Sequence, residues 1–216
     1  MQLSGLTTFI AALALAVSSV QAHATCNPNI APNGQYFVTS IRIPHSFPGS
    51  YTLNVSVKIP DGVNTVIPRE LSGWKVDFTM RPLNPPVVVD DVGIVNTTVD
   101  TVIWYGGQLL NGLYEDFSIS MMLPNVTEGT KLYFPTTQIT TNSTGIKVPL
   151  VWDAIPYPNG TLPDGADDPA PSLTLYTNGV VPSPSPSTAA KSSGHKATGA
   201  VAACLLAVAS LMSLML

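Results

Sequence analysis

The chain has 216 residues, of which 45% are hydrophobic and 10% are charged, and its formal net charge is −4 at pH 7. The nine Lys and Arg residues are scattered, so no basic stripe supports binding to nucleic acid. The only two cysteines, Cys26 and Cys204, are too few for a disulfide framework.

Residues 1–22 have the pattern of a secretory signal peptide. An apolar run ends in Val20-Gln21-Ala22, which places small residues where signal peptidase cleaves. Cleavage after Ala22 makes His23 the first residue of the mature protein. Its α-amine and an imidazole nitrogen can together close a chelate ring on one metal ion, and nitrogen ligands of this kind suit Cu(II). The alternative interpretation of His23 is an idle, exposed terminus.

Cys26 lies three residues after His23. A soft thiolate beside a copper site would suit Cu(I), whereas the alternative is a small buried residue with no role in binding. Cys204 belongs to a C-terminal segment that is predicted to be removed. The mature domain therefore has one thiol and no internal disulfide, and its hydrophobic core must stabilise it.

Residues 23–178 are predicted to form one β-domain. In residues 53–59, apolar and polar side chains alternate with the period of two that gives a strand one buried and one solvated face. Turn signals such as Asp61-Gly62 and Asn111-Gly112 separate the candidate strands, and no segment has a sustained helical period. About eight short strands predict an immunoglobulin-like antiparallel β-sandwich. The candidates are 36–43, 53–59, 74–80, 98–105, 117–123, 132–134, 147–152 and 172–176.

Five Asn-x-Ser/Thr sequons lie within this domain and predict an extracellular glycoprotein. They begin at Asn54, Asn96, Asn125, Asn142 and Asn159.

The C-terminal part predicts a membrane anchor made of lipid. Residues 179–192 are rich in Pro, Ser, Thr and Ala and predict a disordered stalk. Small residues near Ser192, a polar spacer and an uncharged apolar tail then follow in the order of a glycosylphosphatidylinositol (GPI) signal. We expect the anchor at Ser192 and removal of residues 193–216. The alternative, a tail-anchored helix, fits poorly because the apolar tail is short and a signal peptide precedes the domain.

Several short stretches follow one another in an order that resembles the YcnI-like copper-binding domain, known mainly from bacterial envelope proteins. The likeness runs from His23 to about Tyr176. It is carried by stretches that include Arg42-Ile43-Pro44-His45, Gly73-Trp74-Lys75-Val76, Ile103-Trp104-Tyr105-Gly106-Gly107, Trp152-Asp153-Ala154-Ile155-Pro156 and Asp168-Pro169-Ala170-Pro171.

The resemblance implies a β-sandwich that binds Cu(II) through the amine and imidazole of His23, an arrangement called a monohistidine brace. In characterised relatives a tryptophan late in the domain packs over the copper. Trp152 stands at the matching place, where the alternative is an ordinary core residue.

One position departs from the family pattern. Relatives carry a carboxylate ligand after the Arg-x-Pro strand, and the matching residue here is Ser46, which cannot supply a charged oxygen. The neighbouring His45 is the expected substitute, because imidazole is a good copper ligand, although a turn residue is the alternative. The aspartates Asp164, Asp167 and Asp168 are interpreted as solvated loop residues.

These observations predict a non-catalytic Cu(II)-binding protein, held at the outer leaflet of a eukaryotic plasma membrane by a GPI lipid. It would capture or buffer copper, or pass it to a membrane transporter or reductase. One alternative is a copper-dependent oxidase that resembles lytic polysaccharide monooxygenases. The other is a structural, glycosylated cell-wall or surface protein without metal. No nucleophile–base motif and no phosphate-binding loop is present in the sequence.

Overall fold

The computed structural model describes residues 23–181 apart from residues 45, 47, 90–91 and 143. By its internal contacts the chain divides into a unit that ends at Pro182 and a second unit that begins at Ser183, and the second lies outside the described residues. The predicted signal peptide, the anchor residue Ser192 and the removed tail also lie outside them. None of the described residues forms a helix long and apolar enough to cross a membrane.

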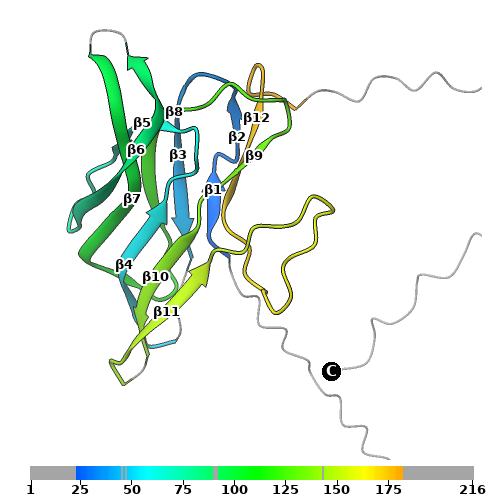
Figure 1. Ribbon diagram of the computed structural model, residues 1–216. Helices are drawn as coiled ribbons and strands as arrows, with labels where there is room; N and C mark the ends of the chain where they lie inside the picture. Colours follow the sequence, from blue (N-terminus) through cyan, green and yellow to red (C-terminus); the bar gives the residue numbers. More distant parts are fainter. Residues whose placement is uncertain (1–22, 45, 47, 90–91, 143, 182–216) are drawn as a thin grey trace, which may run out of the picture. The chain divides into compact units, whose positions relative to one another are not determined.

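The described chain is all-β, as the alternating pattern predicts (Figure 1). A four-stranded sheet has the order β1-β3-β8-β5, a five-stranded sheet the order β11-β10-β4-β7-β6, and a small sheet the order β2-β12-β9. The strands are β1 (Thr25–Asn27), β2 (Ile30–Pro32), β3 (Tyr36–Ile43), β4 (Tyr51–Lys58), β5 (Asn64–Pro68), β6 (Lys75–Val89), β7 (Gly93–Leu110), β8 (Glu115–Met122), β9 (Lys131–Tyr133), β10 (Thr136–Thr141), β11 (Lys147–Trp152) and β12 (Ser172–Tyr176).

The two larger sheets enclose one hydrophobic core, so the fold is the predicted immunoglobulin-like β-sandwich. Phe117 of β8 is fully buried and contacts Trp104 of β7, with their ring centroids 5.3 Å apart. Ile41 of β3 and Val55 of β4 are also fully buried within this core. Every strand pair is antiparallel except β2 with β12, whose parallel pairing begins at Ile30 and Thr174.

The described strands number twelve rather than about eight, because several strands are too short or too polar to show a clear alternation of apolar and polar residues. β10 was not predicted, since its buried face carries Thr136, Gln138 and Thr140 instead of apolar side chains. The amide nitrogen of Gln138 donates a hydrogen bond to the Thr52 hydroxyl of β4, whereas its Oε1 is buried with no hydrogen-bond partner among the described residues. Buried polar side chains that are paired in this way lose less on desolvation.

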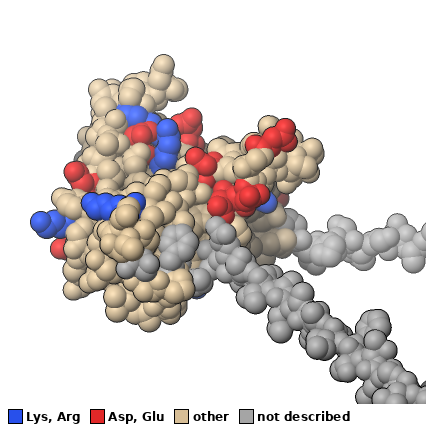
Figure 2. All heavy atoms as spheres, turned by 90° about the horizontal axis from the view of Figure 1, so that it is seen from below, with Lys and Arg blue, Asp and Glu red and all other residues tan. Residues whose placement is uncertain are grey.

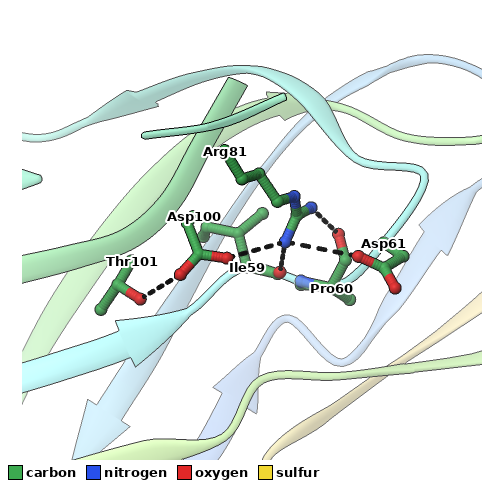
Figure 3. A network of polar contacts seen from close by, with 6 residues as sticks. All are labelled: Ile59, Pro60, Asp61, Arg81, Asp100 and Thr101. Atoms are coloured by element: carbon green, nitrogen blue, oxygen red, sulfur yellow. Dashed lines mark hydrogen bonds and ion pairs between the residues drawn. The ribbon is translucent and has the colours of Figure 1, made fainter. Parts of the chain in front are cut away.

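A charged side chain joins the turn after β4 to the long β6–β7 hairpin. The guanidinium of Arg81 in β6 donates hydrogen bonds to the carbonyl oxygens of Ile59 and Pro60 (Figure 3). The same group lies 3.4 Å from the carboxylate of Asp100 in β7 and 3.5 Å from that of Asp61. Only 16% of the Arg81 side chain is exposed, so these partners replace most of its hydration.

Candidate metal centre

His23 is held at the surface by the strand that follows it. β1 pairs with β3 so that Thr25 lies opposite Arg42 and Cys26 opposite Ile41. Ala24 and Cys26 are buried, whereas His23 and Thr25 are exposed, which is the alternation of a strand that covers a core. The side chain of His23 is 43% exposed. Its position is therefore fixed by the buried residue beside it, while its imidazole remains open to solvent.

A carboxylate from a distant part of the chain lies against this imidazole. Nδ1 of His23 is 3.3 Å from Oδ1 of Asp168, whose side chain is 30% exposed. Asp168 lies in a loop, as interpreted, but it is only partly solvated, because the fold draws its carboxylate against the N-terminal segment. Asp164 and Asp167, on the same loop, are exposed as expected.

The backbone around Asp168 is tied to the segment that follows β11. Ala154 and Pro169 form an isolated parallel bridge. Within it, the amide of Ala154 donates to the Asp168 carbonyl at 3.3 Å, and the amide of Ala170 donates to the Ala154 carbonyl at 2.9 Å. Two residues further along, the Pro171 carbonyl accepts from the amide of Phe134. Asp168 is thus presented from a loop whose end is fastened at several points.

His23 lines a shallow hollow of about 310 Å³. Residues from β1 and β9 line it, together with the loop that leads into β12. They include Thr25, Asn29, Lys131, Tyr133, Pro156, Pro169 and Ser172. Figure 1 places the connection between β11 and β12 on the same side of the sandwich as β1.

The connection from 153 to 171 is acidic. It contains Asp153, Asp164, Asp167 and Asp168 and no Lys or Arg. In the view from below, carboxylates gather on the side of the molecule that carries this connection (Figure 2). A surface of one sign raises the local concentration of ions of the opposite sign, so this side favours the approach of cations.

The donor set fits a copper ion only when the terminal amine is free. Two ligand atoms that bind one ion at right angles, each about 2.0–2.2 Å away, lie about 3 Å apart, so the separation between Nδ1 and Oδ1 is suitable. Among the described residues, no three or more His, Cys, Asp or Glu side chains gather into a metal site. The α-amine of a processed His23 would be the third donor, giving the nitrogen and oxygen ligands that Cu(II) accepts in a planar arrangement.

The other residues predicted for the site lie in different settings. Trp152 ends β11 and is 2% exposed, and its indole Nε1 has no hydrogen-bond partner among the described residues. Cys26 is buried in the core, and burial raises the pKa of its thiol to about 12. His45 lies outside the described residues. Ser46, at the position of the family carboxylate, is buried with its hydroxyl 2.8 Å from that of Ser50.

The five sequon asparagines all lie among the described residues. Asn96, Asn125 and Asn159 are exposed, whereas Asn54 and Asn142 are partly buried. In two sequons the asparagine Oδ1 accepts hydrogen bonds from the backbone amide and hydroxyl of the sequon threonine, at Asn142 with Thr144 and at Asn159 with Thr161. These two sequons lie in turns at the surface.

The sequence alone names His23 as a candidate ligand but does not pair it with Asp168. The signal that could have found it is the Pro169-Ala170-Pro171 stretch directly after it, because prolines restrict the backbone and so hold a preceding side chain in place. No alternation or spacing connects His23 with Asp168, since only the folded chain brings them together.

Comparisons with known proteins place the domain within one family. The model of a domain of unknown function, DUF1775, matches residues 23–175. Among solved structures, the chain is similar to an uncharacterized protein from Nocardia farcinica described as having an immunoglobulin-like fold, with 24% sequence identity and a TM-score of 0.49. That match covers 71% of this chain and 97% of the other. No curated protein matches.

Proposed function

The chain belongs to the DUF1775 family, and from this premise we propose that it is a surface protein that captures Cu(II) through the processed N-terminal His23. The observation that carries the proposal is the placement of His23, exposed at the edge of a hollow directly before buried Ala24. Signal-peptide cleavage at the predicted site would therefore release the amine at a position that the fold already fixes. Amine and imidazole would then hold the ion as neighbouring nitrogen ligands.

The copper is cargo in this proposal, and the protein is not an enzyme. The signal peptide, the sequons and the predicted anchor at Ser192 support a glycosylated protein bound to the outer leaflet by a GPI lipid. From there it would buffer copper or deliver it to a membrane transporter or reductase. The acidic connection after β11 supports capture, because it favours the approach of a divalent cation.

Copper titration followed by electron paramagnetic resonance tests this function. The protein would comprise residues 23–182, which end where the first unit ends and contain the described core. The matched control retains residues 18–22, which converts the free amine of His23 into an amide. It also keeps His23 out of the second and third positions, where a terminal amine, backbone amides and an imidazole chelate Cu(II) on their own. We expect one equivalent of Cu(II) with a nitrogen-rich spectrum from the authentic terminus only. Equally weak spectra from both proteins would contradict a copper function and favour a structural surface glycoprotein.

The same samples address the oxidase alternative. With a reductant and oxygen, a non-catalytic copper carrier should produce no more hydrogen peroxide than the control extended by residues 18–22 with the same total copper. A large excess from the authentic protein, or cleavage of a polysaccharide, would overturn the non-catalytic proposal while leaving the copper site in place.

A further inference from the structure

We propose that Asp168 is the carboxylate ligand of the copper site, replacing the family carboxylate that is absent at Ser46. This inference rests on the proposed function, because it names a further ligand of the same site. Its basis is the 3.3 Å separation between Oδ1 of Asp168 and Nδ1 of His23, two residues at opposite ends of the domain sequence.

Which ring nitrogen of His23 faces Asp168 decides whether Asp168 is a copper ligand or only a hydrogen-bond acceptor for the bound histidine. The α-amine and Nδ1 of one histidine can bind the same ion, because Nδ1 is the ring nitrogen nearer the backbone. Nε2 of that ring is too far from the α-amine to bind the same ion. A carboxylate that only orients a metal-bound histidine accepts a hydrogen bond from the nitrogen that does not bind the metal. Asp168 lies against Nδ1, so it stands on the side of the ring where the ion would bind.

Asp168 and the N-terminal segment are each held in place by their own backbone contacts. Its backbone is fastened to Ala154 through the bridge at Pro169, and the loop beyond is fastened to Phe134. β1 is fastened independently to β3. The two ligand-bearing segments are therefore positioned before any ion arrives, which lowers the entropy that binding must remove.

Ser46, at the position of the family carboxylate, cannot act as an anionic copper ligand. Ser46 has no charge, and it is buried with its hydroxyl next to that of Ser50. Cys26 does not replace it either, because burial keeps its thiol protonated at neutral pH. Among the described His, Cys, Asp and Glu residues, none joins His23 and Asp168 as a third member of the group. Asp168 therefore supplies the anionic oxygen that offsets part of the charge of Cu(II).

Three variants of the 23–182 protein test the assignment. Asp168→Asn removes the negative charge at nearly constant shape, and Asp168→His exchanges the oxygen donor for nitrogen. Asp167→Asn is the matched control. This neighbouring aspartate is exposed, and its substitution removes the same charge from the same loop. Thermal unfolding without copper establishes that each variant is folded before copper is added.

We expect Asp168→Asn to weaken Cu(II) binding by at least the roughly 10- to 100-fold that loss of an outer-shell partner costs, and Asp167→Asn to change it by less than about threefold. Asp168→His should bind copper with one additional nitrogen in the electron paramagnetic resonance spectrum, seen as a lower parallel g value and a larger copper hyperfine splitting. This second readout follows the donor atom directly and would not change if Asp168 only supported the loop.

The outcomes separate this inference from the proposed function. If the authentic terminus binds copper, the control extended by residues 18–22 does not, and both Asp168 variants retain the wild-type affinity and spectrum, the ligand assignment is wrong and the copper function stands. If wild type and the extended control bind equally weakly, the function fails and the assignment falls with it. An equal loss in Asp167→Asn and Asp168→Asn would assign the effect to loop charge and overturn the assignment.

Discussion

The Cys26 thiol is the most strongly perturbed acid among the described residues. Burial raises its pKa from 9.0 to about 12, because the core disfavours the charged thiolate. The folded protein therefore keeps the thiol proton at pH values where the unfolded chain loses it. Cys26 contributes stability that is fully present below about pH 9 and is lost as the pH rises toward 12.

We predict that Cys26→Ala weakens this alkaline loss of stability. The free energy of unfolding of wild type should fall relative to that of Cys26→Ala with a slope that approaches about 1.4 kcal/mol per pH unit between pH 9 and 12. Urea unfolding at a series of pH values measures both proteins, and the difference between them removes the titration of Tyr and Lys. Parallel curves across this range would show that the thiol ionises as easily in the folded protein as in the unfolded one.

The two halves of the candidate site differ in how far sequence can reveal them. The proposal for His23 follows from local information, since a predicted cleavage site and one residue type suffice to suggest a terminal chelate. Asp168 depends on the pairing of β1 with β3 and on the bridge between Ala154 and Pro169, which are tertiary contacts. The three aspartates of this loop have similar sequence surroundings. Asp164 and Asp167 are exposed, as that composition predicts, whereas Asp168 lies against His23, which the composition does not indicate.

At the scale of elements, the packing of the start of β6 against β7 depends on how closely the Trp74 indole approaches Gly107. Trp74, just before β6, packs edge-on against Phe117 with centroids 5.1 Å apart and an interplanar angle of 89°. A Cβ on Gly107 would lie 2.2 Å from the indole ring of Trp74, far inside contact distance. The absence of a side chain at Gly107 is therefore what allows Trp74 to reach the core.

We predict that Gly107→Ala destabilises the domain by about 1–3 kcal/mol, since the indole must move and its contact with Phe117 must open. Chemical denaturation measures the loss. The control is the same change in a Trp74→Ala background, where the methyl group meets no ring and should cost little. An equal cost in both backgrounds would place the effect in the β7 backbone rather than in the contact with Trp74.

The strands that sequence predicts well are those with one wet face. β4 and β8 alternate clearly because each covers the core on one side only. β6 was predicted to end at residue 80 but continues to Val89 through Pro82, Pro85 and Pro86. Prolines are tolerated there because β6 is the edge strand of its sheet, and Pro85 and Pro86 lie in the irregular stretch between Pro82 and Val87, where the pairing with β7 shifts register. Edge position is a property of the sheet, so no local pattern indicates it.

At the scale of the whole molecule, the candidate site joins the two ends of the domain. His23 precedes the first strand, and Asp168 lies just before the last strand, β12. The amine and imidazole of His23 belong to one residue, so they remain together as a chelate in the unfolded chain. Asp168 lies beside them only in the folded chain. Among the described donors, copper can therefore stabilise the fold only by the extra affinity that Asp168 provides.

This argument predicts the size of the thermal effect. If Asp168 strengthens binding by about 10- to 100-fold, saturating Cu(II) stabilises the folded state by about 1.4–2.7 kcal/mol, and the midpoint of thermal unfolding should rise by about 3–10 °C. Calorimetry of the 23–182 protein with and without copper measures the shift. Asp168→Asn should still bind copper through His23 but show almost no rise in the midpoint, because its folded and unfolded states then offer the ion the same two nitrogens. A rise as large in Asp168→Asn as in wild type would mean that another folded-state group completes the site.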